Sequence, residues 1–151
     1  MIWRRLQAWL LRLVGAVEVL AFGAVVMPRA WMGAGYAWLG VGEMPPGPVF
    51  ESVMRQVSFT YGVHGVALWL IASDVVRYRP LVVLTALGYL LAGPVFLLTD
   101  VSLGMPPSWA AGNGGSCLLI GVLLLGLLWG ERAGGKEKSP ATRGPSAVVG
   151  G

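Results

Sequence analysis

The sequence predicts an all-α fold, a bundle of four transmembrane helices with a short interfacial helix in the first outer loop. Composition is the first reason: 56% of the 151 residues are hydrophobic and only 12% are charged, about half the charged fraction of a soluble domain. The second reason is that the apolar residues fall into four stretches, each near the ~20 residues that cross a bilayer. With a mean hydropathy of +0.70, the chain does not fit the soluble enzyme classes.

Helix-breaking residues bound the predicted spans. Pro28 follows the first, Pro80 separates the second and third, and Pro106 follows the third. Four amphipathic soluble helices are the alternative, but they need a polar residue at every third or fourth position, which the third and fourth stretches lack. We therefore predict a transmembrane domain over residues 1–131. Its spans are expected at residues 6–27, 53–73, 81–99 and 113–130.

Basic residues set the predicted orientation. Nine of the eleven Lys and Arg flank one side of the spans and the remaining two flank the other, and short loops rich in Lys and Arg stay in the cytoplasm. We expect a multi-pass protein of the bacterial inner membrane with both termini cytoplasmic. The net charge of +4 follows from this asymmetry, so the expected partner is the lipid bilayer and not nucleic acid. The nine are Arg4, Arg5, Arg12, Arg77, Arg79, Arg132, Lys136, Lys138 and Arg143; the two are Arg29 and Arg55.

Tryptophans agree with this orientation, because indole rings prefer the membrane interface. Trp31, Trp38 and Trp109 are predicted interfacial anchors on the outer side, and Trp69 and Trp129 on the inner side.

The first outer loop, residues 28–48, is long for a hairpin connection. Trp31, Gly35 and Trp38 are spaced by four and then three residues, which puts both indoles on one face of a short helix lying in the interface. Two interpretations remain open: an ordered cap over the mouth of the bundle, or a lid over a site between helices.

Both ends of the chain need a separate interpretation. Arg4 and Arg5 before an apolar run are typical of a signal peptide, but Arg12 and Glu18 interrupt that run and it is long enough to span, so we expect an uncleaved first helix. Residues 132–151 are polar, rich in Gly and Pro and without periodicity, which predicts a disordered cytoplasmic tail.

Ionisable residues at membrane depth are the candidate site. Glu18 lies roughly 13 Å from the outer end of its span and His64 roughly 16 Å, at 1.5 Å per residue, and Tyr89 adds a hydroxyl near the middle of the third span. A charged carboxylate at this depth costs a few kcal/mol, so Glu18 must be neutral, paired or hydrated. The three residues form either a proton-relay or ligand site, or a hydrogen-bonded contact that only fixes helix packing.

Catalytic, metal-binding and cofactor motifs are absent from the sequence. One His and one Cys are too few for a zinc or haem site built from this chain alone, so we expect no metal and no cofactor. The first functional hypothesis is non-enzymatic: an accessory or assembly partner for another membrane protein or a second copy. The alternative is a transport or redox protein that handles protons, a small solute or a quinone through Glu18 and His64. An intramembrane enzyme ranks third, because no nucleophile–base pair is evident.

The ends of the first and third predicted spans are similar at an offset of 78 residues, which indicates either a duplicated helical hairpin or convergent helix-stop chemistry. The matching stretches are Met27-Pro28-Arg29-Ala30-Trp31 and Met105-Pro106-Pro107-Ser108-Trp109, preceded by the pairs Gly15 and Gly93, Val17 and Val95, and Leu20 and Leu98.

Short motifs run through residues 15–129. They include Met27-Pro28 with Trp31, Trp38-Leu39-Gly40-Val41-Gly42, Tyr61-Gly62-Val63-His64-Gly65 and Arg77-Tyr78-Arg79-Pro80-Leu81. Together they resemble a family of small four-span bacterial membrane proteins with no established activity. The resemblance implies the four-helix fold and no particular chemistry. A looser likeness to DoxX-like and BphX-like proteins concerns architecture only.

Overall fold

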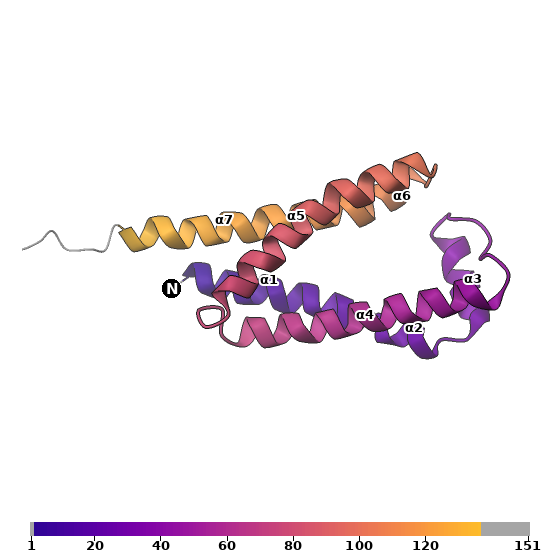
Figure 1. The fold of residues 1–151 in the computed structure, drawn as a ribbon, viewed down its shortest axis with the longest axis horizontal. Helices are drawn as coiled ribbons and strands as arrows, with labels where there is room; N and C mark the ends of the chain where they lie inside the picture. Colours follow the sequence, from indigo (N-terminus) through magenta and orange to yellow (C-terminus); the bar gives the residue numbers. More distant parts are fainter. Residues whose placement is uncertain (1, 137–151) are drawn as a thin grey trace, which may run out of the picture.

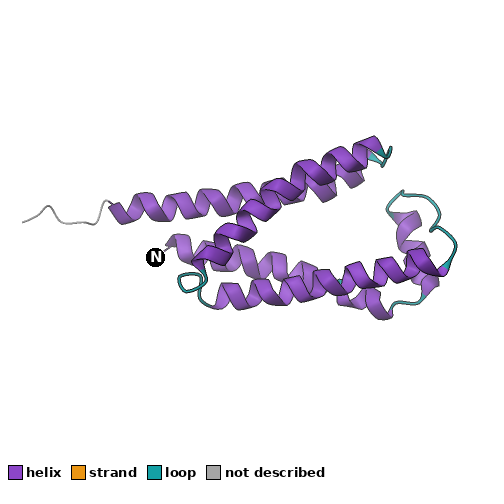
Figure 2. Ribbon diagram, viewed as in Figure 1, coloured by secondary structure: helices purple, strands orange, loops and turns teal. Residues whose placement is uncertain are grey.

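In the computed structural model, which describes residues 2–136, the chain is all-helical. Figure 2 shows helices joined by turns and loops, without a strand in this range. The predicted all-α class is therefore confirmed. Along the chain the elements are α1 (Ile2–Val19), α2 (Phe22–Val26), α3 (Arg29–Trp38), α4 (Pro48–Ser73), α5 (Arg79–Ser102), α6 (Pro107–Ala110), the π-helical segment η1 (Ala111–Gly115) and α7 (Ser116–Lys136).

Three helical segments are long and apolar enough to cross a membrane: Ile2–Val26, Arg79–Ser102 and Pro107–Ala133. Helix α4 has 26 residues, about 39 Å at 1.5 Å per residue, and is long enough. It is not among the three, because polar side chains along its length, among them Gln56 and His64, lower its mean hydropathy. The predicted span at residues 53–73 stays a prediction.

Two helical hairpins make up the molecule. Helix α4 packs along α1 and α2, and α7 packs along α5 and η1 (Figure 1). The backbones of the two hairpins come close mainly between α1 and α7, whereas those of α4 and α5, although joined by the short turn at residues 74–78, stay further apart. We call the end of the molecule with this turn the turn end, and the end with α3 and α6 the loop end.

The hydrophobic core lies toward the turn end, where all four long helices meet. Leu11, Leu68, Val82 and Leu124, one from each of α1, α4, α5 and α7, are at most 1% exposed. Toward the loop end no comparable cluster of buried residues joins the hairpins within the described part of the chain. The two hairpins are thus fastened at one end and diverge at the other.

Glycines set the close approach within each hairpin. A Cβ on Gly15 would lie 2.7 Å from the Gly65 carbonyl oxygen, and one on Gly65 would lie 2.6 Å from the Gly15 carbonyl oxygen. In the second hairpin a Cβ on Gly114 would lie 2.7 Å from the Gly93 carbonyl oxygen. Side chains at these positions would push the helices apart, so glycine is what allows backbone contact.

Several boundaries differ from the sequence-based ones. The first predicted span, residues 6–27, is interrupted by a turn at residues 20–21. Helix α7 continues to Lys136, past the expected start of the tail at residue 132, and Glu131, just before this extension, forms a 2.7 Å ion pair with Arg4 of α1. Residues 137–151 of the predicted tail lie outside the described residues. The helix expected in the first outer loop is present as α3, and its place at a membrane interface stays a prediction.

Candidate functional site

Glu18, His64 and Tyr89 come together between the hairpins, one each from α1, α4 and α5. His64 Nδ1 lies 2.6 Å from Glu18 Oε2, and the Tyr89 hydroxyl donates a hydrogen bond to Glu18 Oε1. The rings of His64 and Tyr89 meet edge to face, with centroids 6.1 Å apart. One carboxylate therefore links the first hairpin to the second.

The glycine contact in the first hairpin positions two of these residues. Glu18 follows Gly15 by three residues, and His64 precedes Gly65. A Cβ on Gly65 would lie 3.0 Å from Glu18 Cβ, so the helices are as close here as two backbones allow. Glu18 and His64 must then face each other across α1 and α4.

The side chains of Glu18 and His64 differ in how deeply they are buried. The Glu18 side chain is 11% exposed, while that of His64 is 47% exposed. Within residues 2–133 no buried side-chain nitrogen or oxygen lacks a hydrogen-bond partner, and both oxygens of the Glu18 carboxyl group have one. The imidazole is open on one side.

A cavity of about 380 Å³ adjoins this cluster. Its wall is mainly apolar, and α5 supplies most of it. Thr85 lies one turn before Tyr89, and Cys117 reaches the cavity from α7. The lining residues are Glu18, Tyr61, His64, Leu84, Thr85, Gly88, Tyr89, Ala92, Phe96 and Cys117.

Sequence reasoning did not identify Thr85 or Cys117 as site residues. The four-residue spacing of Thr85 and Tyr89 on an otherwise apolar helix is a signal that could have found Thr85. Cys117 carries no such signal, because its place depends on how the second hairpin packs. A further cavity of about 500 Å³ shares Tyr61 and His64 with the first, and its lining residues all come from α4: Gln56, Val57, Thr60, Tyr61 and His64.

The arrangement can hold and pass a proton. An ionised Glu18 accepts hydrogen bonds from Tyr89 and from the Nδ1–H group of His64, which leaves His64 Nε2 as an acceptor with no partner among the described side chains. A hydroxyl group placed in the cavity can bond to this nitrogen. No group of three His, Cys, Asp or Glu in residues 2–136 is placed to hold a metal ion.

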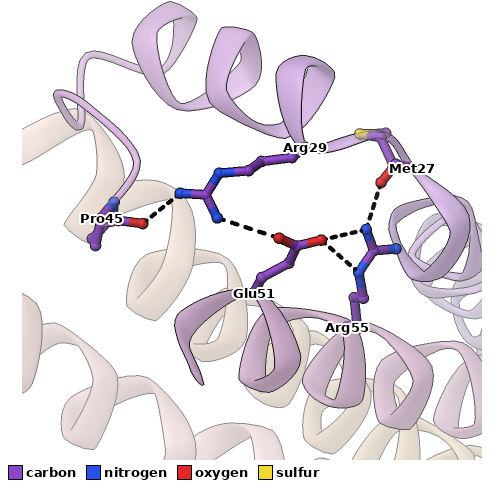
Figure 3. Close-up of polar contacts among 5 residues, drawn as sticks. All are labelled: Met27, Arg29, Pro45, Glu51 and Arg55. Atoms are coloured by element: carbon purple, nitrogen blue, oxygen red, sulfur yellow. Dashed lines mark hydrogen bonds and ion pairs between the residues drawn. The ribbon is translucent and has the colours of Figure 1, made fainter. Parts of the chain in front are cut away.

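A second polar cluster ties the loop end together (Figure 3). Glu51 accepts hydrogen bonds from Arg55 Nη2 at 2.7 Å and from Arg29 Nη1 at 3.2 Å. Arg55 also donates to the Met27 carbonyl oxygen at 2.9 Å, and Arg29 to that of Pro45 at 2.9 Å. The hydrogen bonds from Arg55 and then Arg29 lower the pKa of Glu51. This cluster, the loop clamp, fastens the α2–α3 connection and the following loop to α4.

The predicted tryptophan anchors differ in how exposed they are and in what they contact. Trp31, Trp38 and Trp129 lie mostly on the surface and are 69%, 85% and 75% exposed. Trp109 is half-buried. Trp69 has a packing role as well, because its Nε1–H donates to the Arg12 carbonyl oxygen at 3.0 Å and so joins α4 to α1.

Comparisons of the chain with models of protein families, with curated proteins and with solved structures find no match.

Proposed function

We propose that the protein is a four-span membrane protein that binds a small, largely apolar ligand carrying a hydroxyl or carbonyl oxygen, and exchanges a proton with it through Glu18, His64 and Tyr89. Quinones and quinols belong to this class. The observation that carries the proposal is the bridged Glu18 carboxylate at the wall of a 380 Å³ cavity.

The cavity suits such a ligand in size and lining. Small-molecule sites are mostly apolar clefts of ~300–1,000 Å³ with a few polar groups that fix orientation. Here Leu84, Ala92 and Phe96 offer apolar surface, while His64 and Thr85 offer hydrogen bonds. A contact that only fixed helix packing would need neither the space nor the half-exposed imidazole.

The proposed membrane arrangement has α4 as the remaining span, both termini in the cytoplasm and α3 in the outer interface of a bacterial inner membrane. It is supported by the pairing of α4 with α1 along their length and by the basic residues at the turn end. The bacterial membrane rests on the resemblance of the motifs alone.

The test is a binding measurement on purified protein with duroquinol, a methylated hydroquinone, under anaerobic conditions. Duroquinol should raise the melting temperature of the wild type saturably, because a ligand that binds only the folded state stabilises it. Its dimethyl ether, which cannot donate a hydrogen bond, should have no comparable effect. Glu18→Gln should bind at least about tenfold more weakly, because the carboxylate's hydrogen bond with His64 Nδ1 keeps Nε2 as the acceptor for the ligand, and hydrogen bonds to charged groups contribute about 1.5–3 kcal/mol.

The matched control is Thr99→Val, on α5 but outside the cavity, where the hydroxyl bonds only to the Val95 carbonyl oxygen. Its response to duroquinol should equal that of the wild type. A wild-type protein that does not respond, or a Glu18→Gln variant that responds as the wild type does, would overturn the proposal.

A second candidate is the accessory or assembly role expected from composition. One observation favours it: the backbones of α4 and α5 stay apart, and large side chains on them such as Val66 and Leu91 are 49% and 70% exposed. A transmembrane helix of another protein could pack there. Purification in mild detergent that yields a stoichiometric partner protein, with no duroquinol response, would favour this role.

A further inference from the structure

A hollow at the turn end is separate from the site between the hairpins. It has a volume of about 350 Å³ and lies between the start of α1 and the end of α4 with its following turn. Three arginines and a tryptophan line it from α1. The full lining is Arg4, Arg5, Ala8, Trp9, Arg12, Ala72, Ser73, Asp74, Val75 and Val76.

The charge of this hollow is only partly balanced. Arg4 is paired with Glu131 at 2.7 Å, but Arg5 and Arg12 make no ion pair with any residue in the described range. The single acid in the lining, Asp74, uses Oδ1 to accept hydrogen bonds from the backbone N–H groups of Val76 and Arg77, at 3.1 and 3.0 Å. Two guanidinium groups are thus left to bind an anion.

Arg12 makes the strongest case because of its depth. It lies six residues into the predicted first span, about 9 Å at 1.5 Å per residue. A charged side chain at this depth costs several kcal/mol unless it reaches the polar headgroups or an ion of opposite charge. Long arginine side chains extend toward lipid phosphates for this reason.

We propose that the hollow binds the phosphate group of an anionic phospholipid, with Arg5 and Arg12 as its ligands. Guanidinium groups bond phosphate oxygens in pairs, which a phosphate ester satisfies. Free phosphate shares this chemistry, but the apolar part of the lining and the 69% exposed indole of Trp9 fit the glycerol and acyl region of a lipid.

The experiment uses the full chain, purified in mild detergent with equal amounts of phosphatidylglycerol and phosphatidylcholine, and native mass spectrometry to count retained lipid. The wild type should retain mostly phosphatidylglycerol. The double variant Arg5→Gln with Arg12→Gln should lose about tenfold of that preference. The matched control, Arg77→Gln with Arg132→Gln, removes the same charge at the same end but outside the hollow and should keep the preference.

Three outcomes decide the proposal. Equal losses in both double variants would show diffuse electrostatic attraction and overturn the site. Displacement of the lipid by millimolar inorganic phosphate would overturn the assignment to a lipid, whereas retention supports it. If the glutamine variant does not fold, Arg5→Lys with Arg12→Lys keeps the charge and should still weaken retention several-fold, because an ammonium group cannot bond phosphate in the paired geometry.

Discussion

At the scale of single residues, Glu18 combines two duties that substitution can separate. Its carboxyl group holds His64 and Tyr89, and it belongs to the proposed site. An amide at this position keeps the size and can still form hydrogen bonds, whereas an apolar side chain leaves both partners without one.

We therefore expect Glu18→Leu to lower the stability by about 1–3 kcal/mol, because the partly buried Tyr89 hydroxyl loses its hydrogen-bond partner and the bond to His64 is lost. The melting temperature in detergent should fall by several degrees. Glu18→Gln should melt close to the wild type. Equal losses in the two variants would mean that the negative charge itself, and not the hydrogen bonds, holds the hairpins together.

The loop clamp predicts a pH dependence. Because the pKa of Glu51 is lowered in the folded protein from its ordinary value of 4.5, the clamp stabilises the fold above that pH and loses its contribution as the pH falls through the lower, folded value. The melting temperatures of wild type and Glu51→Gln should differ near pH 7 and converge toward acid. The Gln variant keeps every other acidic group, so a difference that persists below the folded pKa would contradict this account.

The sequence predicted part of the site for clear reasons. Depth along a span follows from counting residues, so Glu18, His64 and Tyr89 could be placed at one level. The cavity could not be predicted, because it exists only where the hairpins diverge, and that depends on helix packing. For the same reason Cys117 was not foreseen.

At the scale of helices, the sequence predicts the position of a helix best where a long stretch of residues is uniformly apolar. The third and fourth predicted spans carry no polar stripe, and the helices in these regions are α5 (Arg79–Ser102) and α7 (Ser116–Lys136). Helix α4 is different, because one face carries the polar residues of the site, and its hydropathy alone does not establish a span. The polar residues on this face lower the hydropathy by which a span would be predicted.

Backbone contact within the hairpins gives a prediction for glycine. Gly65→Ala should lower the melting temperature, because its Cβ would lie 2.6 Å from the Gly15 carbonyl oxygen and 2.8 Å from the Val19 nitrogen, and such overpacking costs about 1–3 kcal/mol. The matched control is Gly126→Ala on α7, where nothing lies within 4 Å of the added Cβ. Its melting temperature should not fall; a loss as large as that of Gly65→Ala would refute the backbone contact.

At the scale of the whole molecule, the two hairpins use the same device at related positions. Gly15 and Gly93 are 78 residues apart, the offset of the sequence repeat. A Cβ added to Gly65 would contact the carbonyl oxygen of Gly15 and the backbone nitrogen of Val19, four residues later. A Cβ added to Gly114 would contact the corresponding atoms of the second hairpin, the carbonyl oxygen of Gly93 and the backbone nitrogen of Leu97. This equivalence favours a duplicated hairpin over convergent helix ends.

The proposed topology can be tested across the whole chain. A reporter active only in the cytoplasm should work at the C-terminus and in the turn at residues 74–79, and should fail at Gly42 and Gly112, because the basic residues gather at the turn end. Activity at Gly112 together with inactivity at the C-terminus would contradict four spans.

Cys117 is the only cysteine among the 151 residues, and it lies on the wall of the cavity between the hairpins. The sequence therefore has one thiol, at the place where a bound ligand would lie, and no second thiol that would react with a labelling reagent. A membrane-permeant alkylating reagent should label the Cys117 sulfur quickly when the cavity is empty and slowly when a ligand fills it. The labelling rate of the unmodified protein therefore reports whether a ligand occupies the cavity, and it can be measured on whole membranes before the ligand has been identified.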